Sequence, residues 1–233
     1  MADRVLYDLA GADPDRRFSP YCWRAKLALA HKGLAFEAIP WRLTDKDAIA
    51  MSGQDRVPVL IDAGRVVFDS WNIADYLEAN YPDAPSLFDG PEGRSLARFV
   101  SHWTDAVMVM AIARMVVVDV HAVIHEKDRG YFRASREARL GKSLEAVVAD
   151  REAALPVFRQ GLEPLRALLR EQPFVGGARP TYADYIPFSL FQWAANVSRL
   201  SLLTPDDPLT AWCDRVAELH GGLARKGRLA PAA

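Results

Sequence analysis

The hydrophobic pattern of the chain changes once, across a segment rich in proline and glycine between residues 82 and 92. Before this segment, short β-branched and apolar runs alternate with single helical patterns, which is typical of a layered domain with a sheet. After it, apolar residues recur only at helical spacing. The sequence therefore predicts an α/β domain over residues 1–81, a linker over 82–92 and an all-α domain over 93–233.

The first 81 residues predict the element order βαβ followed by ββα. The first helix has two start signals, Ser19 at the cap and Pro20 at the first helical position, and Gly33 closes it. The two strands on either side of this helix should be parallel, and Ala63-Gly64 should turn a hairpin. Strands are predicted over 4–9, 36–41, 56–62 and 65–68, and helices over 21–31 and 70–80.

The second half predicts helices alone. One further helix should open at Thr181, where Thr181 and Asp184 have the spacing of a capping box. A break is expected near Pro156 and Pro164, because proline interrupts helical hydrogen bonding. Helical regions are predicted over 94–125, 136–170, from 181 onward, and over 209–219.

Bulk composition excludes several classes of function. The chain has 29 Lys and Arg against 30 Asp and Glu, a formal net charge of -1, so neither nucleic acid nor an acidic membrane surface is an expected partner. The two cysteines, Cys22 and Cys213, lie far apart, which favours a reducing compartment. No signal-peptide pattern is present. The most apolar stretch, 106–118, is interrupted by Arg114, and we expect it to be too short to span a bilayer. We expect a soluble, cytoplasmic protein.

The first candidate site residue is Ser19. A serine at a helix N-cap commonly does no more than accept a backbone hydrogen bond. Here Ser19-Pro20-Tyr21-Cys22 follows a strand and a loop and opens a helix, so Ser19 lies at the positive end of a helix dipole. Such a position stabilises a thiolate, and Ser19 is a candidate to activate one.

Two dipeptides complete the candidate site. A cis bond at Val57-Pro58 would leave the Val57 backbone free to pair with a peptide ligand, but the sequence does not decide the isomer. Asp69-Ser70 begins the next helix, where free N–H groups suit a carboxylate and Asp69 suits an ammonium group. An ordinary capping pair explains the same two residues.

In order and spacing, these motifs resemble the cytosolic glutathione transferases over nearly the whole chain. The resemblance implies a thioredoxin-like first domain, glutathione as cosubstrate, a homodimer and a small electrophile as second substrate. It implies that Val57, preceding a cis-Pro58, holds the cysteinyl backbone, that Asp69 and Ser70 hold the γ-glutamyl end, and that Arg42 or Arg56 meets the glycyl carboxylate. The family more often has Glu where this chain has Asp69.

The magnitudes allow Ser19 to act without a base. Lowering a thiol pKa from about 8.5 by about two units needs about 2.7 kcal/mol. A helix end supplies roughly 0.3–1 kcal/mol and a hydrogen bond to a charged group roughly 1.5–3 kcal/mol.

Two other residues are candidates for the activating role. Tyr7 lies at the end of the first strand, and some transferase classes use a tyrosine hydroxyl. Cys22 is the second candidate, because the run from Ser19 to Cys22 resembles a glutaredoxin motif in which serine replaces the first cysteine. Cys22 is expected to pack inside its helix.

Within the superfamily, the sequence is most similar to bacterial lignin β-aryl-etherases and fungal etherase-type transferases. The similarity is carried by the runs FSPYCWRAKLAL, RVPVLID and FDSWNIADYL and by residues 131–155. It implies attack of the thiolate on an aromatic electrophile, with β-aryl ether cleavage as one form of it. A non-catalytic protein that binds glutathione or an apolar ligand is the alternative.

The electrophile pocket is expected between the domains, along the first long helix of the second. Its candidate lining residues are Trp103, Met108, Met110 and Arg114, because methionine suits an adaptable apolar pocket. An ordinary helix core explains the same residues. His121 and His125 share an i, i+4 spacing, but without a third ligand no metal site is predicted.

Overall fold

The computed structural model describes residues 4–225, and a four-stranded sheet forms the centre of its first domain. The strands are β1 (Arg4–Leu9), β2 (Glu37–Trp41), β3 (Val59–Asp62) and β4 (Arg65–Phe68), in the spatial order β2-β1-β3-β4. β1 is parallel to β2, antiparallel to β3, and β3 and β4 form the expected hairpin. The predicted thioredoxin-like fold is confirmed.

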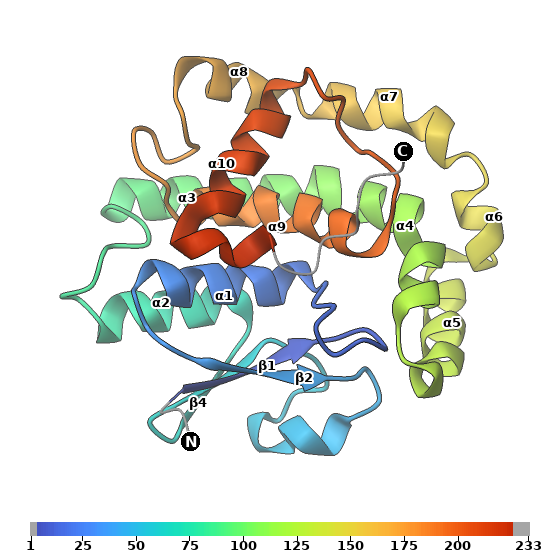
Figure 1. Ribbon diagram of the computed structural model, residues 1–233, viewed down its shortest axis with the longest axis horizontal. Helices are drawn as coiled ribbons and strands as arrows, with labels where there is room; N and C mark the ends of the chain where they lie inside the picture. Colours follow the sequence, from blue (N-terminus) through green and yellow to red (C-terminus); the bar gives the residue numbers. More distant parts are fainter. Residues whose placement is uncertain (1–3, 226–233) are drawn as a thin grey trace.

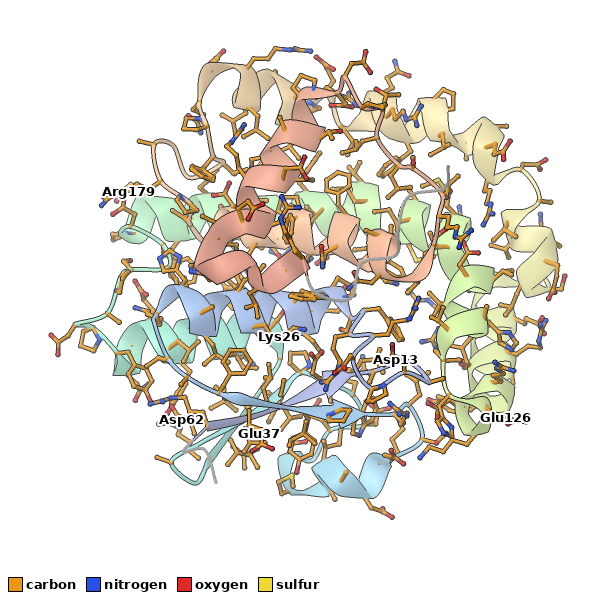
Figure 2. All side chains as sticks on the ribbon, viewed as in Figure 1. Asp13, Lys26, Glu37, Asp62, Glu126 and Arg179 are labelled. Atoms are coloured by element: carbon orange, nitrogen blue, oxygen red, sulfur yellow. The ribbon has the colours of Figure 1, made fainter. Side chains whose placement is uncertain are left out.

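Two helices cover one face of this sheet, α1 (Pro20–His31) and α2 (Ser70–Asn80), and Figure 1 shows both between the sheet and the second domain. A short 3₁₀ segment, η1 (Lys46–Ser52), covers the other face and was not predicted. Because side chains alternate along β1, Leu6 and Asp8 point toward α1, whereas Tyr7 packs in the small cluster around Trp41 and Val59. Lys26, labelled in Figure 2, lies between α1 and the sheet. Its ammonium is 2.8 Å from the buried Asp8 carboxylate.

The second domain is helical throughout its described part, also as predicted. A continuous stretch, Pro91–Val123, contains α3 (Pro91–Thr104), a π-helical turn η2 (Asp105–Val109) and α4 (Met110–Val123). The other helices are α5 (Glu126–Leu140), α6 (Leu144–Val148), α7 (Arg151–Gly161), α8 (Glu163–Glu171), α9 (Tyr182–Val197) and α10 (Pro208–Gly222), followed by the 3₁₀ turn η3 (Leu223–Arg225).

Two expectations for this domain were wrong. The break expected near Pro164 is confirmed, since α7 ends at Gly161 and α8 begins at Glu163, but the break near Pro156 is wrong, because Pro156 lies inside α7. A further boundary was not predicted: α5 ends at Leu140, before Gly141 with its φ of 70°. The apolar stretch was also expected to be too short to span a bilayer, but it lies within the 33-residue helix Pro91–Val123, which is long and apolar enough to cross a membrane. In the folded protein Met108, Ile112 and Val116 of this helix are fully buried in the core of the second domain.

Helix α9 joins the two domains. It begins at the predicted capping box of Thr181 and Asp184, and nearly all of its side chains are buried. Its first residue, Tyr182, donates its hydroxyl to the Ser70 carbonyl at the start of α2 (2.8 Å). Ser189 further along accepts a hydrogen bond from Arg24 of α1 (3.2 Å). Figure 1 shows α9 lying along α1, so the start of each first-domain helix is held against the second domain.

Candidate active site

Ser19 is the N-cap of α1. Its Oγ accepts a hydrogen bond from the Cys22 backbone N–H at 3.3 Å, and Pro20 occupies the first helical position. A hydroxyl that accepts through a lone pair keeps its hydrogen available to donate. The first turn of α1 contains no acidic side chain to offset the positive end of the helix dipole. The position therefore favours a negatively charged atom placed next to Ser19.

A cavity of about 250 Å³ opens beside Ser19, between the two domains. Residues of the first domain line one side of the cavity, and residues of α4, α5 and α9 line the other. Apolar side chains make up most of the lining, and its polar members are a serine, a tyrosine and two arginines. The lining residues are Leu9, Phe18, Ser19, Pro20, Tyr21, Leu43, Val109, Met110, Ala113, Val117, Val120, Phe132, Arg136, Arg139, Leu140 and Trp193.

Three polar lining residues were missed from the sequence. Tyr21 lies next to the cap, and burial raises the pKa of its phenol, so this hydroxyl stays protonated at neutral pH and able to donate. Arg136 and Arg139 project from α5, three positions apart. The spacing of the two arginines was readable, but α5 has charged residues all around it, so the sequence does not show which face meets the cavity.

The Val57–Pro58 peptide bond is cis, which settles the isomer that the sequence left open. Val57 is 9% exposed and belongs to the same apolar cluster as Cys22, so the loop before β3 lies against the first turn of α1. The side chain of Val57 thus faces the protein interior next to the Ser19 cap.

Asp69 caps α2 and has a positive φ of 68°. One carboxylate oxygen, Oδ1, accepts from the backbone N–H groups of both Trp71 (2.9 Å) and Asn72 (3.2 Å), while the residue as a whole is exposed. Ser70 is buried at the first position of α2. Helices α1 and α2 pack against each other on the same face of the sheet (Figure 1).

The two arginines considered for a carboxylate differ in their surroundings. Arg42 is half-buried and donates from Nη2 to the Ala12 carbonyl at 3.2 Å, so it holds the loop that leads into α1. Arg56 is 82% exposed, directly before the cis peptide bond, and its ion pair with the exposed Asp55 (3.0 Å) is open to solvent. Arg56 is therefore free to exchange partners with a ligand.

Neither rival of Ser19 faces the cavity. Tyr7 is half-buried on the opposite face of the sheet, in the cluster with Trp41 and Val59. Cys22 is fully buried, as expected, and burial raises the pKa of its thiol, although the nearby Ser19 hydroxyl acts in the other direction. Cys22 therefore stays a neutral thiol inside the helix.

The residues proposed from the sequence to line the pocket were mostly wrong. Met110 does line the cavity, but Met108 is fully buried in the core and Trp103 packs, half-buried, against that core. Arg114 faces a separate hollow between α4 and α7. These four residues spiral around one helix, so a single cavity cannot meet all of them.

The two histidines do not form a metal site in the described structure. His125 is the N-cap of α5 and accepts from the Lys127 backbone N–H, and His121 packs beside the Phe132 ring. Among residues 4–225, no three metal-binding side chains lie together.

The fold and the site define a two-domain protein with a helix-cap serine at a cavity between a thioredoxin-like domain and a helical domain. The sequence matches the family models for the glutathione S-transferase N-terminal domain, over residues 14–86, and C-terminal domain, over residues 95–222. The chain belongs to the glutathione S-transferase family.

Individual relatives are distant. The chain is 28% identical to glutathione S-transferase U7 of Arabidopsis thaliana over 101 residues, 42% of this chain and 44% of that protein, so it matches less than half of this relative's length. Glutathione transferase GSTFuA3 from Phanerochaete chrysosporium superposes with a TM-score of 0.82 and 26% identity, covering 92% of this chain and 96% of that one. A glutathione S-transferase of Ceriporiopsis subvermispora, solved in complex with glutathione, superposes with a TM-score of 0.78 and 25% identity over 99% of both chains.

Proposed function

We propose that this protein is a glutathione transferase in which Ser19 activates the glutathione thiol. The observation that carries the proposal is the Ser19 hydroxyl at the α1 N-terminus, opening into a mostly apolar cavity. A sulfur placed there receives the Ser19 hydrogen bond and the field of the helix, together about 2–4 kcal/mol in favour of the thiolate. This preference is enough to keep much of the bound thiol ionised at neutral pH.

Further residues of the first domain are proposed to hold the tripeptide. The Val57 backbone pairs with the cysteinyl residue in the manner of an added strand. The N-terminus of α2 at Ser70 takes the γ-glutamyl carboxylate, and Asp69 takes the ammonium group through Oδ2, because its cap hydrogen bonds both go to Oδ1. Arg56 meets the glycyl carboxylate; its exposure favours it over Arg42, which is already bonded to Ala12.

The proposed reaction is nucleophilic substitution at an aromatic or aryl-ether carbon. The thiolate sulfur forms a bond to the electrophilic carbon, and a halide or a phenolate leaves with the bonding electron pair. The cavity suits an aromatic electrophile, since Phe132 and Trp193 line it beside Met110. β-Aryl ether cleavage remains the more specific proposal, suggested by the sequence similarity to etherase-type transferases.

Thiol titration of the glutathione complex tests this function. We expect thiolate absorbance in the ultraviolet to persist to about two pH units below the pKa of free glutathione. A complex that binds glutathione without this shift would identify the protein as the non-catalytic binder of glutathione or of an apolar ligand. A screen of β-aryl ethers, aryl halides and peroxides then identifies the electrophile.

We also propose a cytoplasmic homodimer, as the family resemblance implies. Helix α3 presents Phe99, which is 68% exposed, and Leu96, which is 37% exposed, as apolar surface for a second copy. A monomer mass in dilute solution would contradict this assembly.

A further inference from the structure

The cavity beside Ser19 has an unusual distribution of charge. Two guanidinium groups, those of Arg136 and Arg139, line it, and no lining residue is acidic. Within the described residues, neither arginine has a carboxylate oxygen within the 4.0 Å of an ion pair, although many other arginines of the protein do, such as Arg133 with Glu137 and Glu145. The charge of the cavity is therefore uncompensated by the residues that form it.

The contacts made by these two arginines are to neutral groups. Arg136 lies over the Phe132 ring, with Cζ 4.7 Å from the ring centroid, and donates to the Ser135 hydroxyl at 3.0 Å. Arg139 donates to the Met110 sulfur at 3.2 Å. Burial and the neighbouring Arg139 lower the pKa of Arg136, because both raise the free-energy cost of its positive charge. An anion between the two groups would relieve that cost.

Two acidic residues at neighbouring helix starts, Asp105 of η2 and Asp69 of α2, do not line the cavity. Asp105 lies 3.9 Å from the buried Arg24, and Asp69 accepts the backbone N–H groups that begin α2. The arginines also belong to the second domain, whereas the groups proposed to hold glutathione all belong to the first. Because Arg136 and Arg139 line the mostly apolar cavity beside Ser19, we assign them to the electrophile and not to the tripeptide.

We propose that Arg136 and Arg139 make this cavity selective for aromatic electrophiles that carry an acidic substituent, such as an aryl carboxylate. The inference rests on the proposed function, because it concerns the second substrate of the same site. The ring packs among the apolar lining residues, the carboxylate pairs with the guanidinium fork, and the reacting carbon faces the sulfur at Ser19. Neutral analogues of the same shape leave both charges unpaired and bind less well.

A matched pair of aryl chlorides tests the inference: 4-chloro-3-nitrobenzoate and 4-chloro-3-nitrobenzamide. With either one, the glutathione sulfur bonds to the chlorine-bearing carbon and chloride leaves with the electron pair. Each rate is divided by the rate with free glutathione, which removes the difference in intrinsic reactivity. We expect kcat/KM to favour the benzoate by at least about tenfold, the effect of a charge-assisted hydrogen bond in a partly desolvated site.

Substitutions of the two arginines test whether they cause the preference for the benzoate. Arg136→Gln, Arg139→Gln and the double variant should lower the benzoate preference, the double variant by at least about tenfold. Arg129→Gln is the matched control, since Arg129 is exposed on the same helix and does not line the cavity. Arg139 is exposed, so its variant tests the inference even if changing the half-buried Arg136 disturbs folding.

Three results would decide between the inference and the proposed function. Equal turnover of the two chlorides, or a rise in KM for glutathione instead of for the electrophile in the variants, overturns the inference and leaves the transferase function intact. If neither chloride reacts, calorimetry with the unreactive 3-nitrobenzoate and 3-nitrobenzamide still applies. A benzoate preference that the arginine variants abolish then supports the anion site while the transferase function fails.

Discussion

The Asp128 carboxylate, in the first turn of α5, accepts a hydrogen bond from the Thr44 hydroxyl at 2.6 Å, although the two residues lie 84 positions apart. The same carboxylate accepts the backbone N–H groups of Leu43 and Thr44, each at 3.0 Å, and it is fully buried. Leu43 and α5 both line the cavity, so this contact sets the distance between its first-domain side and its second-domain side.

Replacing Asp128 with asparagine should therefore weaken both the fold and the cavity. The amide replaces one of the two accepting oxygens with an NH2 group, which then faces a backbone N–H that is itself a donor, and we expect the free energy of unfolding to fall by about 1–3 kcal/mol. KM for the electrophile should rise more than KM for glutathione. Denaturant unfolding and steady-state kinetics measure the two effects. Glu126→Gln, an exposed change in the same helical turn, is the control and should alter neither quantity.

The activating role of Ser19 predicts a specific change in Ser19→Ala. Loss of the hydroxyl should raise the pKa of the bound glutathione thiol by about one to two units, because one hydrogen bond to a charged sulfur is lost. Turnover at neutral pH should fall about tenfold or more while glutathione affinity changes little. Ultraviolet titration of the complex measures the pKa.

Ser19→Thr keeps a hydroxyl and a helix cap, so it should retain most of the turnover that Ser19→Ala loses. Tyr7→Phe should have little effect, since Tyr7 packs on the other face of the sheet. Full turnover in Ser19→Ala would transfer activation to backbone donors or to Tyr7.

Asp69 has two roles that substitution can separate. Asp69→Asn keeps an oxygen for the α2 cap and tolerates a positive φ, but it loses the negative charge. We expect nearly unchanged thermal stability and an increase in KM for glutathione, because the ammonium group loses its partner. Asp69→Ala should in addition lose about 1 kcal/mol of stability with the cap. An unchanged KM in Asp69→Asn would show that this carboxylate serves only the helix.

A pair of histidines that both contact the Tyr185 hydroxyl predicts how stability depends on pH. The Tyr185 hydroxyl lies 2.7 Å from His31 Nδ1 and 3.0 Å from His220 Nε2, between α1, α9 and α10. Burial, and to a lesser extent His31, lower the pKa of His220 from 6.5 to about 4. Between these values the unfolded chain binds a proton that the native protein does not, so stability should fall as the pH drops from 6.5 toward 4.

Thermal unfolding across this pH range measures the effect. His220 has a φ of 54°, a conformation that asparagine adopts readily, so His220→Asn removes the titrating group without forcing the backbone. The variant should show a shallower fall in melting temperature with acid than the unchanged protein. Equal slopes would place the proton uptake elsewhere.

Most of the elements that position Ser19 could be predicted because their signals are local. Ser19, Pro20 and Thr181 are caps or first-turn residues whose effect acts within one turn of helix, and the α1 and α9 starts agree with them. The break near Pro156 failed for the same reason: a local signal was opposed by tertiary packing, and α7 continues through the proline with Phe158 buried.

The lining residues from the second domain could not be predicted, because they depend on which face of each helix packs against which neighbour. Met108 and Met110 differ by two positions, which is more than half a turn, so only one faces the cavity. The π-helical turn Asp105–Val109 changes which side chains face the cavity at this point of the helix. Its sequence contains no proline or glycine from which the turn could be predicted. Arg133 lies three positions before Arg136 on the same helix, but it pairs with Glu137 and Glu145 and does not line the cavity.

The bonds between the domains limit how the two halves could be exchanged between related proteins. A chimaera that takes its thiol-binding half from one parent and its helical half from another would keep Ser19 but would need compatible residues wherever the halves are bonded. These contacts include Thr44 with Asp128, Ser70 with Tyr182, Arg24 with Ser189 and His31 with Tyr185. The junction at Asp128 requires Thr44 or an equivalent donor, whereas the junction at Tyr182 uses a Ser70 carbonyl that any residue provides. A chimaera should therefore take the residue at position 44, like those at positions 24 and 31, from the parent that supplies the helical half.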